Sequence, residues 1–172
     1  MNNRFNSIAV AIALLGISTG TAQAANTTII TVIANIVASP CTVSTETLNI
    51  DLGDIQASAL EAAGSTTPWS PVNSILLTDC PAGTSSVIAS FQGTPATNGD
   101  SDGYKNEGAA PTISVQLADN EPTPKMLSTG KTESLNVVNK AAQVDLKARL
   151  YSSGVAAPGA VKSTINVGFE YK

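Results

Sequence analysis

The stretch Thr164-Ile165-Asn166-Val167-Gly168-Phe169-Glu170-Tyr171 places an apolar residue at nearly every second position. Side chains alternate between the two faces of a β-strand, so this pattern predicts a strand with one buried face. Alternating or continuous apolar runs recur upstream, at residues 48–52, 72–78, 87–91, 113–117 and 144–150. Turn-forming residues separate these runs, and only the Ala- and Leu-rich stretch 55–63 favours a short helix or turn. Many short strands in about 150 residues predict an all-β sandwich.

The N-terminus has the three parts of a secretory signal peptide. A single charge at Arg4 precedes a short apolar core at residues 8–17, and Ala22-Gln23-Ala24 follows as a cleavage site. A bilayer span needs about 20 apolar residues, so this core is too short to cross a membrane. An amphipathic or buried first helix is the alternative. We therefore predict that residues 1–24 are a signal peptide and that the mature chain has no transmembrane segment.

Composition excludes several classes of function. Removing Arg4 with the predicted signal leaves 8 Lys and Arg against 13 Asp and Glu, a formal charge of −5. Nucleic acid binding rests on clustered cations, so a nucleic acid partner is not expected, nor is a polybasic membrane site. The chain contains no histidine and no G-x-S-x-G motif. Without a base that titrates near neutral pH, an enzyme is not expected, and no cofactor is implied.

Two cysteines, Cys41 and Cys80, are present. Export to an oxidising compartment and the even count together predict that they form a disulfide. Closing a loop of about 40 residues stabilises a fold by about 4 kcal/mol in the chain-entropy model. A metal site and a redox pair are the alternatives. The first lacks further ligands and the second lacks C-x-x-C spacing, so the structural disulfide is favoured.

The segment Asn98-Gly99-Asp100-Ser101-Asp102-Gly103 resembles the start of a calcium-binding loop. A calcium loop of this kind ends with a glutamate at its twelfth position, which is Ala109 here, and lies between two helices. No helical pattern flanks the segment. A solvated hairpin loop is therefore the favoured interpretation.

The segment that follows the predicted cleavage site is unusual for a closed domain. Residues 26–40 are rich in β-branched side chains and contain no charge. An exposed segment of this composition is an aggregation hazard if it stays unpaired. Two interpretations compete: an ordinary first strand of the sandwich, or a donor strand that completes a sheet in another molecule. In the second interpretation the apolar face consists of Ile30, Val32, Ala34 and Ile36.

Four sequence features occur together along the chain. They are Val37-Ala38-Ser39-Pro40-Cys41-Thr42-Val43, Leu77-Thr78-Asp79-Cys80-Pro81, Gly159 and Gly168-Phe169-Glu170-Tyr171-Lys172. With these features the chain resembles the pilins of the chaperone–usher pathway, specifically type 1 fimbrial subunits. Within this family the chain is most similar to the minor tip-fibrillum, or adaptor, subunits. The short internal sequences that carry this similarity are Ile50-Asp51-Leu52-Gly53-Asp54, Gly83-Thr84-Ser85, Ala89-Ser90-Phe91 and Gly103-Tyr104-Lys105-Asn106-Glu107-Gly108. One departure is Ala34, where family arms usually carry a glycine.

The resemblance implies an incomplete immunoglobulin-like β-sandwich that lacks its final strand. It implies a donor-strand extension at residues 25–40, a pilin domain at 41–172, and export through the periplasm to the cell-surface fimbrium. Its implied partners are a periplasmic pilus chaperone, an outer-membrane usher and neighbouring pilin subunits, including an adhesin or adaptor. The strand that binds the chaperone and walls the groove would contain Ile165, Val167, Phe169 and Tyr171.

A small fimbrial adhesin that binds host glycans directly is the alternative function. Its aromatic candidate is Trp69, the single tryptophan, in Thr67-Pro68-Trp69-Ser70-Pro71. A packing role at a strand start is the simpler interpretation of this residue. The tip adhesins of this pathway typically carry a separate receptor-binding domain and lack the arm, so the resemblance favours a structural or adaptor subunit.

Overall fold

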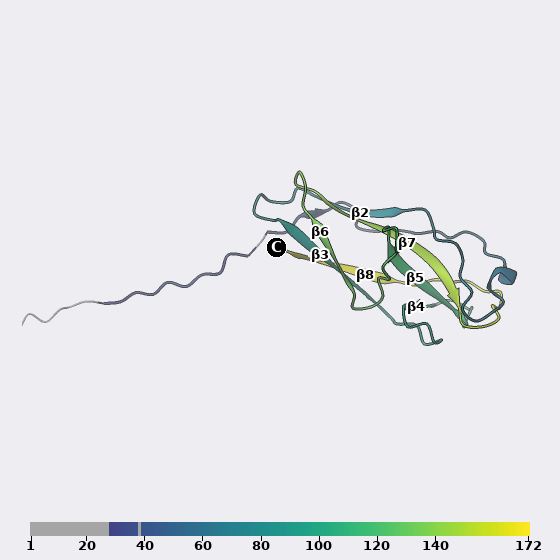
Figure 1. Ribbon diagram of the computed structural model, residues 1–172. Helices are drawn as coiled ribbons and strands as arrows, with labels where there is room; N and C mark the ends of the chain where they lie inside the picture. The colour runs from purple at the N-terminus through teal and green to yellow at the C-terminus, as the bar shows by residue number, and fades with distance from the viewer. Residues whose placement is uncertain (1–27, 38) are drawn as a thin grey trace, which may run out of the picture. The chain divides into compact units, whose positions relative to one another are not determined.

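The computed structural model describes residues 28–37 and 39–172, so the predicted signal peptide lies outside the described residues. The chain divides into two units, one of which includes residues 28–35 and the other residues 36–172. Residues 28–37 contain no hydrogen-bonded strand. The strands found among the described residues all lie in the second unit (Figure 1). No helix in the described part of the chain is long and apolar enough to cross a membrane.

The second unit contains eight strands and one short 3-10 helix. In chain order these are β1 (Thr42–Val43), η1 (Ala57–Leu60), β2 (Asn73–Thr78), β3 (Ser86–Gly93), β4 (Gly103–Lys105), β5 (Ile113–Asp119), β6 (Thr132–Asn136), β7 (Ala142–Ser152) and β8 (Ile165–Tyr171). The helix η1 lies within the stretch 55–63 where the sequence favours a short helix or turn.

The strands form two antiparallel sheets. One has the order β1-β2-β7-β5-β4 and the other the order β6-β3-β8. Strand β8 pairs along its whole length with β3, with Ala89 opposite Phe169 and Val87 opposite Tyr171. Non-consecutive strands are neighbours in both sheets, as is usual in sandwiches with Greek-key connections. The predicted all-β sandwich is confirmed.

The main core lies between the two sheets. Its buried members from the five-stranded sheet are Ile75, Leu77, Tyr104, Leu117, Ala142, Val144, Leu146 and Ala148, and those from the three-stranded sheet are Val87, Ala89, Phe91 and Leu135. Burial alternates along β3 and β7 as the sequence predicts. A full-length alternation of this kind fixes the strand register, because a slip of one residue would expose the apolar face.

The segment 48–52 differs from its prediction as a strand. Its side chains alternate as expected, with Leu48, Ile50 and Leu52 half-buried and Asn49 and Asp51 exposed. Yet the segment belongs to neither sheet. The alternation shows that one face packs on the core, but no strand lies beside it in the described structure to supply a hydrogen-bonding partner.

Strand β5 also differs from its prediction, because its polar face is buried. Ser114 and Gln116 are both buried beneath the loop that contains Asp100. The Asp100 carboxylate accepts hydrogen bonds from Ser114 Oγ at 2.6 Å and from Gln116 Nε2 at 3.0 Å. Gln116 Oε1 in turn accepts one from Arg149 Nε at 2.8 Å. The 98–103 loop thus folds over the outer face of the sheet, and the protein itself supplies donors to its buried carboxylate.

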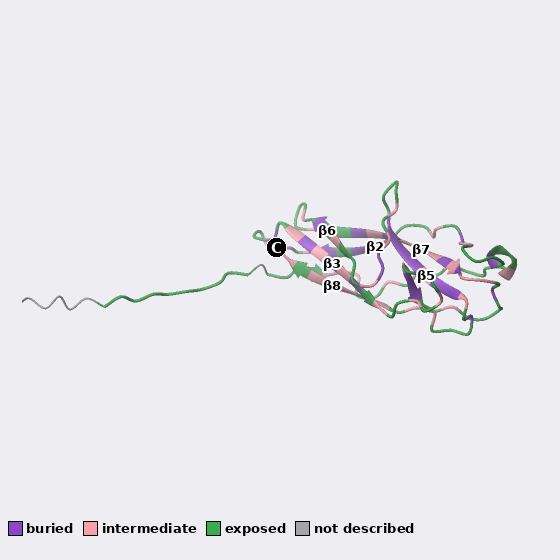
Figure 2. Cartoon of the chain, turned by 60° about the horizontal axis from the view of Figure 1, so that its bottom comes forward, coloured by how far each residue is buried: buried purple, intermediate pink, exposed green. Residues whose placement is uncertain are grey.

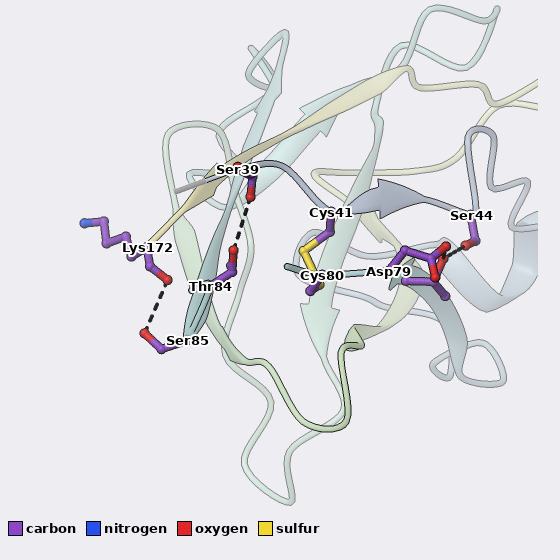
Figure 3. The surroundings of a disulfide bond; sticks show 9 residues. Ser39, Cys41, Ser44, Asp79, Cys80, Thr84, Ser85 and Lys172 are labelled. Carbon is purple, nitrogen blue, oxygen red and sulfur yellow. Dashed lines mark hydrogen bonds between the residues drawn. A yellow bond between two sulfur atoms is a disulfide. The ribbon is translucent and has the colours of Figure 1, made fainter. Parts of the chain in front are cut away.

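The predicted disulfide between Cys41 and Cys80 is confirmed (Figure 3). It joins the residue before β1 to the residue just beyond the end of β2, and both cysteines are buried. Thr84 and Ser85, which follow the turn at Ala82 and Gly83 and lie near the bridge, hold two further segments. Thr84 Oγ1 donates to the Ser39 carbonyl at 3.2 Å, and Ser85 N donates to the Lys172 carbonyl at 2.6 Å. Ser39, which precedes the disulfide, and Lys172, which follows β8, are therefore held by neighbouring residues of the same loop.

Tyr104 of β4 is the largest of the fully buried side chains. Its hydroxyl donates a hydrogen bond of 2.6 Å to the Leu127 carbonyl. Burial raises the pKa of Tyr104 to about 12 from its ordinary value of 10.0. Between these two values the unfolded chain releases the phenol proton while the folded chain retains it, so the free energy of unfolding falls as the pH rises.

We therefore expect Tyr104→Phe to lower the free energy of unfolding at pH 7 by about 1–2 kcal/mol, because the buried carbonyl loses its donor. The variant should also lose less stability than the wild type on going from about pH 10 to about pH 12. Urea denaturation at both pH values measures the two effects. Tyr151→Phe is the matched control, since the Tyr151 hydroxyl has no hydrogen-bond partner among the described residues. Equal alkaline losses in wild type and Tyr104→Phe would contradict the assignment.

Candidate functional site: a groove between two unpaired edges

Strand β8 has one free edge. It pairs with β3 on one side, and no strand of the described structure pairs with its other side. Its inward residues Ile165, Val167 and Phe169 pack against the core but are only half-buried, whereas the inward residues of β3 are fully buried. Figure 2 shows the same contrast between β8 and the largely buried β5 and β7. The inward face of β8 therefore lacks a covering neighbour on one side.

The second edge is the segment 45–55, which follows β1. At its start it is held to β2 by two hydrogen bonds, one from the preceding Ser44 N to the Leu76 carbonyl and one from Leu76 N to Thr45 Oγ1. Beyond Thr45 its backbone joins no ladder among the described strands. Its apolar side chains Leu48, Ile50 and Leu52 nevertheless point toward the core. Gly53 N donates to Asp51 Oδ1, but no backbone group between Thr47 and Leu52 pairs with a neighbouring strand in the part of the chain that the structure describes. With its inward apolar face, this part of the segment has the features of an unpaired sheet edge.

A groove of about 1060 Å³ lies between these two edges. Its walls are the segment 43–55 on one side and residues 161–169 on the other. Its lining includes apolar side chains from all three long strands of the five-stranded sheet, namely Ile75, Ile113, Val115, Leu117, Leu146, Ala148 and Leu150. The groove thus has a floor of core side chains and half-buried apolar walls between two unpaired backbone edges, a combination that is unfavourable in water.

The groove connects two separate apolar clusters. Ile75 and Leu117 belong to the main core, and Val43 and Phe169 pack against it. A smaller cluster consists of Leu60, Ala110, Ile113, Leu150 and Ala156. Leu52 packs against both clusters. An apolar strand laid along the groove would contact both and join them into one core.

The residues predicted as the groove wall occupy the expected strand. Ile165, Val167 and Phe169 line the groove. Tyr171 packs against the main core but is not part of the lining, and burial raises its pKa above the ordinary value. Gly159 also lines the groove, and a Cβ there would lie 3.0 Å from the Ala109 backbone carbonyl carbon. A glycine is therefore suited to the close approach of these two loops.

The residues predicted as the donor face lie in the extended segment 28–37. Ile30, Val32 and Ile36 are 83%, 86% and 100% exposed, and Ala34 is also exposed. Ile29 and Ile33 of the opposite face are 91% and 86% exposed, so residues 28–37 bury neither face in the chain. Free-standing apolar residues at this density are typical of a surface that another protein covers.

Sequence reasoning missed the smaller cluster and one rim. Leu60, Ala110 and Ala156 come from three separate segments, and the rim residues Val161 and Lys162 precede β8. Only the Ala- and Leu-rich stretch 55–63 gave a local signal. The three segments meet through tertiary packing, for example through the hydrogen bond from Ala156 N to the Leu60 carbonyl.

Comparison with known proteins assigns this architecture. The family model for fimbrial proteins matches residues 28–172. The chain is 39% identical to Protein FimG of Escherichia coli strain K12 over 162 residues, covering 92% of this chain and 93% of that protein. It is 34% identical to the S-fimbrial adhesin protein SfaS of Escherichia coli O6:K15:H31 strain 536, covering 98% of this chain and 99% of that protein.

Among solved structures, the P pilus rod subunit PapA aligns with a TM-score of 0.63 at 21% identity, covering 78% of this chain and all of that chain. This likeness shows that the fold is the immunoglobulin-like fold of pilins. Together with the family match over most of the sequence, it means that the chain belongs to the fimbrial protein family and is a structural subunit of a cell-surface fimbria.

Proposed function

We propose that this subunit assembles by donor-strand complementation. Its groove accepts a strand from one neighbouring subunit, and its arm, residues 25–40, enters the groove of another. The observation that carries the proposal is the apolar groove between two unpaired backbone edges, in a chain whose uncharged arm is 81–100% exposed at its large side chains. Ile30, Val32, Ala34 and Ile36 form the face that enters the neighbour.

The energetics support this mode of assembly. An inserted strand gives the free backbone groups of β8 and of segment 45–55 hydrogen-bonding partners. Burying four apolar side chains of the arm stabilises the contact by about 6–10 kcal/mol. Each subunit donates at one site and accepts at another, so the contact is head-to-tail and does not close on itself. A filament is the expected product.

The open groove also explains a need for helper proteins before assembly. An exposed core next to free sheet edges favours aggregation during export. A periplasmic pilus chaperone that lends a strand to β8 would cover the groove, with Ile165, Val167, Phe169 and Tyr171 on the wall that it meets. An outer-membrane usher would then bring the next subunit, whose arm replaces the chaperone strand.

Deleting residues 26–39 tests the proposal directly. The truncated subunit retains both cysteines and every residue that lines the groove. We expect it to bind the chaperone as the full-length subunit does but to give no polymer when mixed with a subunit whose groove is open, because it has no strand to donate. Polymer length is measured by size-exclusion chromatography and by gel electrophoresis without boiling.

A second variant keeps the arm length but replaces Ile30, Val32 and Ile36 by serine, which removes the apolar face that is proposed to enter the groove. This variant should polymerise poorly, and chaperone binding should again be unaffected. If the truncated subunit polymerises as the full-length subunit does, then residues 26–39 are a strand of their own domain and the proposal is wrong.

Direct adhesion to host glycans is a second candidate, favoured by the 34% identity to a protein named as an S-fimbrial adhesin. In this chain the Trp69 ring has the Arg149 guanidinium 4.3 Å from its centroid and the Lys147 ammonium 5.9 Å from it. Cation–π contacts with these two side chains occupy a face of the ring on which a sugar would otherwise stack. The arrangement supports a packing role for Trp69, so assembly remains the primary proposal.

A further inference from the structure

The rims of the groove carry an uneven charge. Three carboxylates line it on the side of segment 45–55, those of Glu46, Asp51 and Asp54. Lys162 is the one cation in the lining, as far as the described residues extend. All four side chains are exposed, and neither of the two salt bridges formed by described residues involves any of them. The groove mouth is therefore acidic and its charges are not neutralised by the subunit itself.

The opposite rim provides no compensation along most of its length. The outward residues of β8 next to the groove are Asn166 and Gly168, and both are exposed and uncharged. On segment 45–55 the side chains of Asn49 and Asp51 point outward, between the inward residues Leu48, Ile50 and Leu52. A strand inserted between these rims would bury its inward face on the core and place its outward side chains beside the carboxylates.

We propose that the groove selects a donor strand that carries lysine or arginine on its outward face. The proposal rests on the donor-strand function proposed above and adds the chemistry of the partner. Opposite charges on neighbouring strands attract and like charges repel. Charges at the rim of an interface act mainly on the association rate and on its salt dependence. The carboxylates therefore favour basic arms during encounter and disfavour acidic ones.

This chemistry separates a second copy of the chain from a different subunit. The chain's own arm contains no charged residue between Asn26 and Pro40. In the predicted register the polar residues on its outward face are Thr31 and Asn35, and neither carries a positive charge that could pair with the carboxylates. The neighbour on the groove side is therefore a different subunit with a basic arm, and self-association is the slower reaction.

Peptides that differ only in charge test the proposal. The native peptide covers residues 26–37, one variant carries Thr31→Lys with Asn35→Lys, and another carries Thr31→Glu with Asn35→Glu. Each is added to the full mature chain, and the association rate is measured by fluorescence anisotropy. We expect the lysine peptide to associate about 3–10-fold faster than the glutamate peptide in about 20 mM salt, with the native peptide between them. The difference should shrink strongly in about 0.5 M salt.

Acceptor variants assign the effect to the rim. Asp51→Asn with Asp54→Asn should remove most of the difference between the two charged peptides. The matched control is Asp79→Asn with Glu121→Gln, which removes the same charge from exposed positions outside the groove lining. This control should leave the difference unchanged.

The peptide pair is repeated with the charges at Val32 and Ile36, because charges in the inward phase block insertion whatever their sign. The lysine and glutamate peptides are then compared with their charges on the face of the strand where a charge still permits insertion. Equal rates for both signs, or a faster glutamate peptide, overturn the proposal of a basic partner. If no peptide binds, including the native one, the donor-strand function itself is wrong.

Discussion

Subunits with Val32→Asp in the arm are expected to exchange into a fixed acceptor subunit at least about 100-fold more slowly than wild type. Val32 lies in the middle of the predicted inward face, with Ile30 and Ala34 on either side. In the inserted strand its side chain would be buried in the acceptor's core, where a carboxylate has no partner and a large desolvation penalty. The rate of chaperone displacement, followed by native gel electrophoresis, measures the effect.

The neighbouring variant Thr31→Asp is the matched control. It adds the same charge one residue away, on the face predicted to remain in solvent. A one-residue step moves a side chain to the opposite face of a strand, so the two variants distinguish the two possible registers. We expect Thr31→Asp to slow exchange less than about 5-fold, since an exposed charge acts only through screened interactions. A more harmful Thr31→Asp would show that the odd-numbered face of the arm, and not the face of Ile30 and Val32, enters the groove.

Replacing both Cys41 and Cys80 by alanine is expected to lower the free energy of unfolding by about 4 kcal/mol. The bridge closes a loop over a sequence separation of 39 residues and thereby restricts the unfolded chain. A loss of this size is a large fraction of the stability of an ordinary domain, and the open groove leaves this subunit with less core than a complete sandwich. Urea denaturation of the isolated subunit provides the measurement.

Reduced wild-type protein is the control for this substitution. If the loss comes from the restraint, then the wild type in dithiothreitol and the double alanine variant should unfold at similar urea concentrations. Adding a saturating arm peptide should raise the midpoint of all three forms, because the ligand binds only the folded state. A double variant within about 1 kcal/mol of the oxidised wild type would contradict the expected role of the bridge.

Local patterns were sufficient for the long strands. The apolar residues of β3, β7 and β8 alternate in the sequence, and the structure places each set on the inner face of its sheet. The disulfide followed from compartment and cysteine count. In these elements the local preference and the tertiary structure agree, which is why a one-dimensional pattern predicted them.

Short edge elements were not predictable in this way. Strand β6 has a single buried side chain, Leu135, and β4 has only three residues. Strands β6 and β7 are joined by Asn139 and Lys140, both with positive φ, although neither is a glycine. A positive φ at a lysine is uncommon, so the sequence carries no strong signal for this turn. Likewise, no local pattern reports that Ser114 and Gln116 are buried by Asp100.

The groove was predictable only in part. Its β8 wall was expected, and its other wall at 48–52 was expected as a strand because its side chains alternate. The alternation predicts which side chains face the core. It does not predict whether another strand pairs with the backbone, because side-chain burial and backbone pairing are separate requirements. The far end of the groove depends on Leu60, Ala110 and Ala156, which are brought together by tertiary packing alone.

The position of the disulfide has a mechanical consequence for a subunit that is pulled through its arm. Tension on residue Ser39 reaches Cys41 and crosses the sulfur bridge to Cys80, which is next to the loop that holds the end of β8. The chain between the two cysteines is thereby kept out of the load path. At about 3.4 Å per extended residue, the bridge prevents the 39-residue separation between the cysteines from extending to a length of about 130 Å. A pulling force therefore cannot extend the chain through β1, the groove rim and β2. The force acts instead on the contacts between the strands of neighbouring subunits.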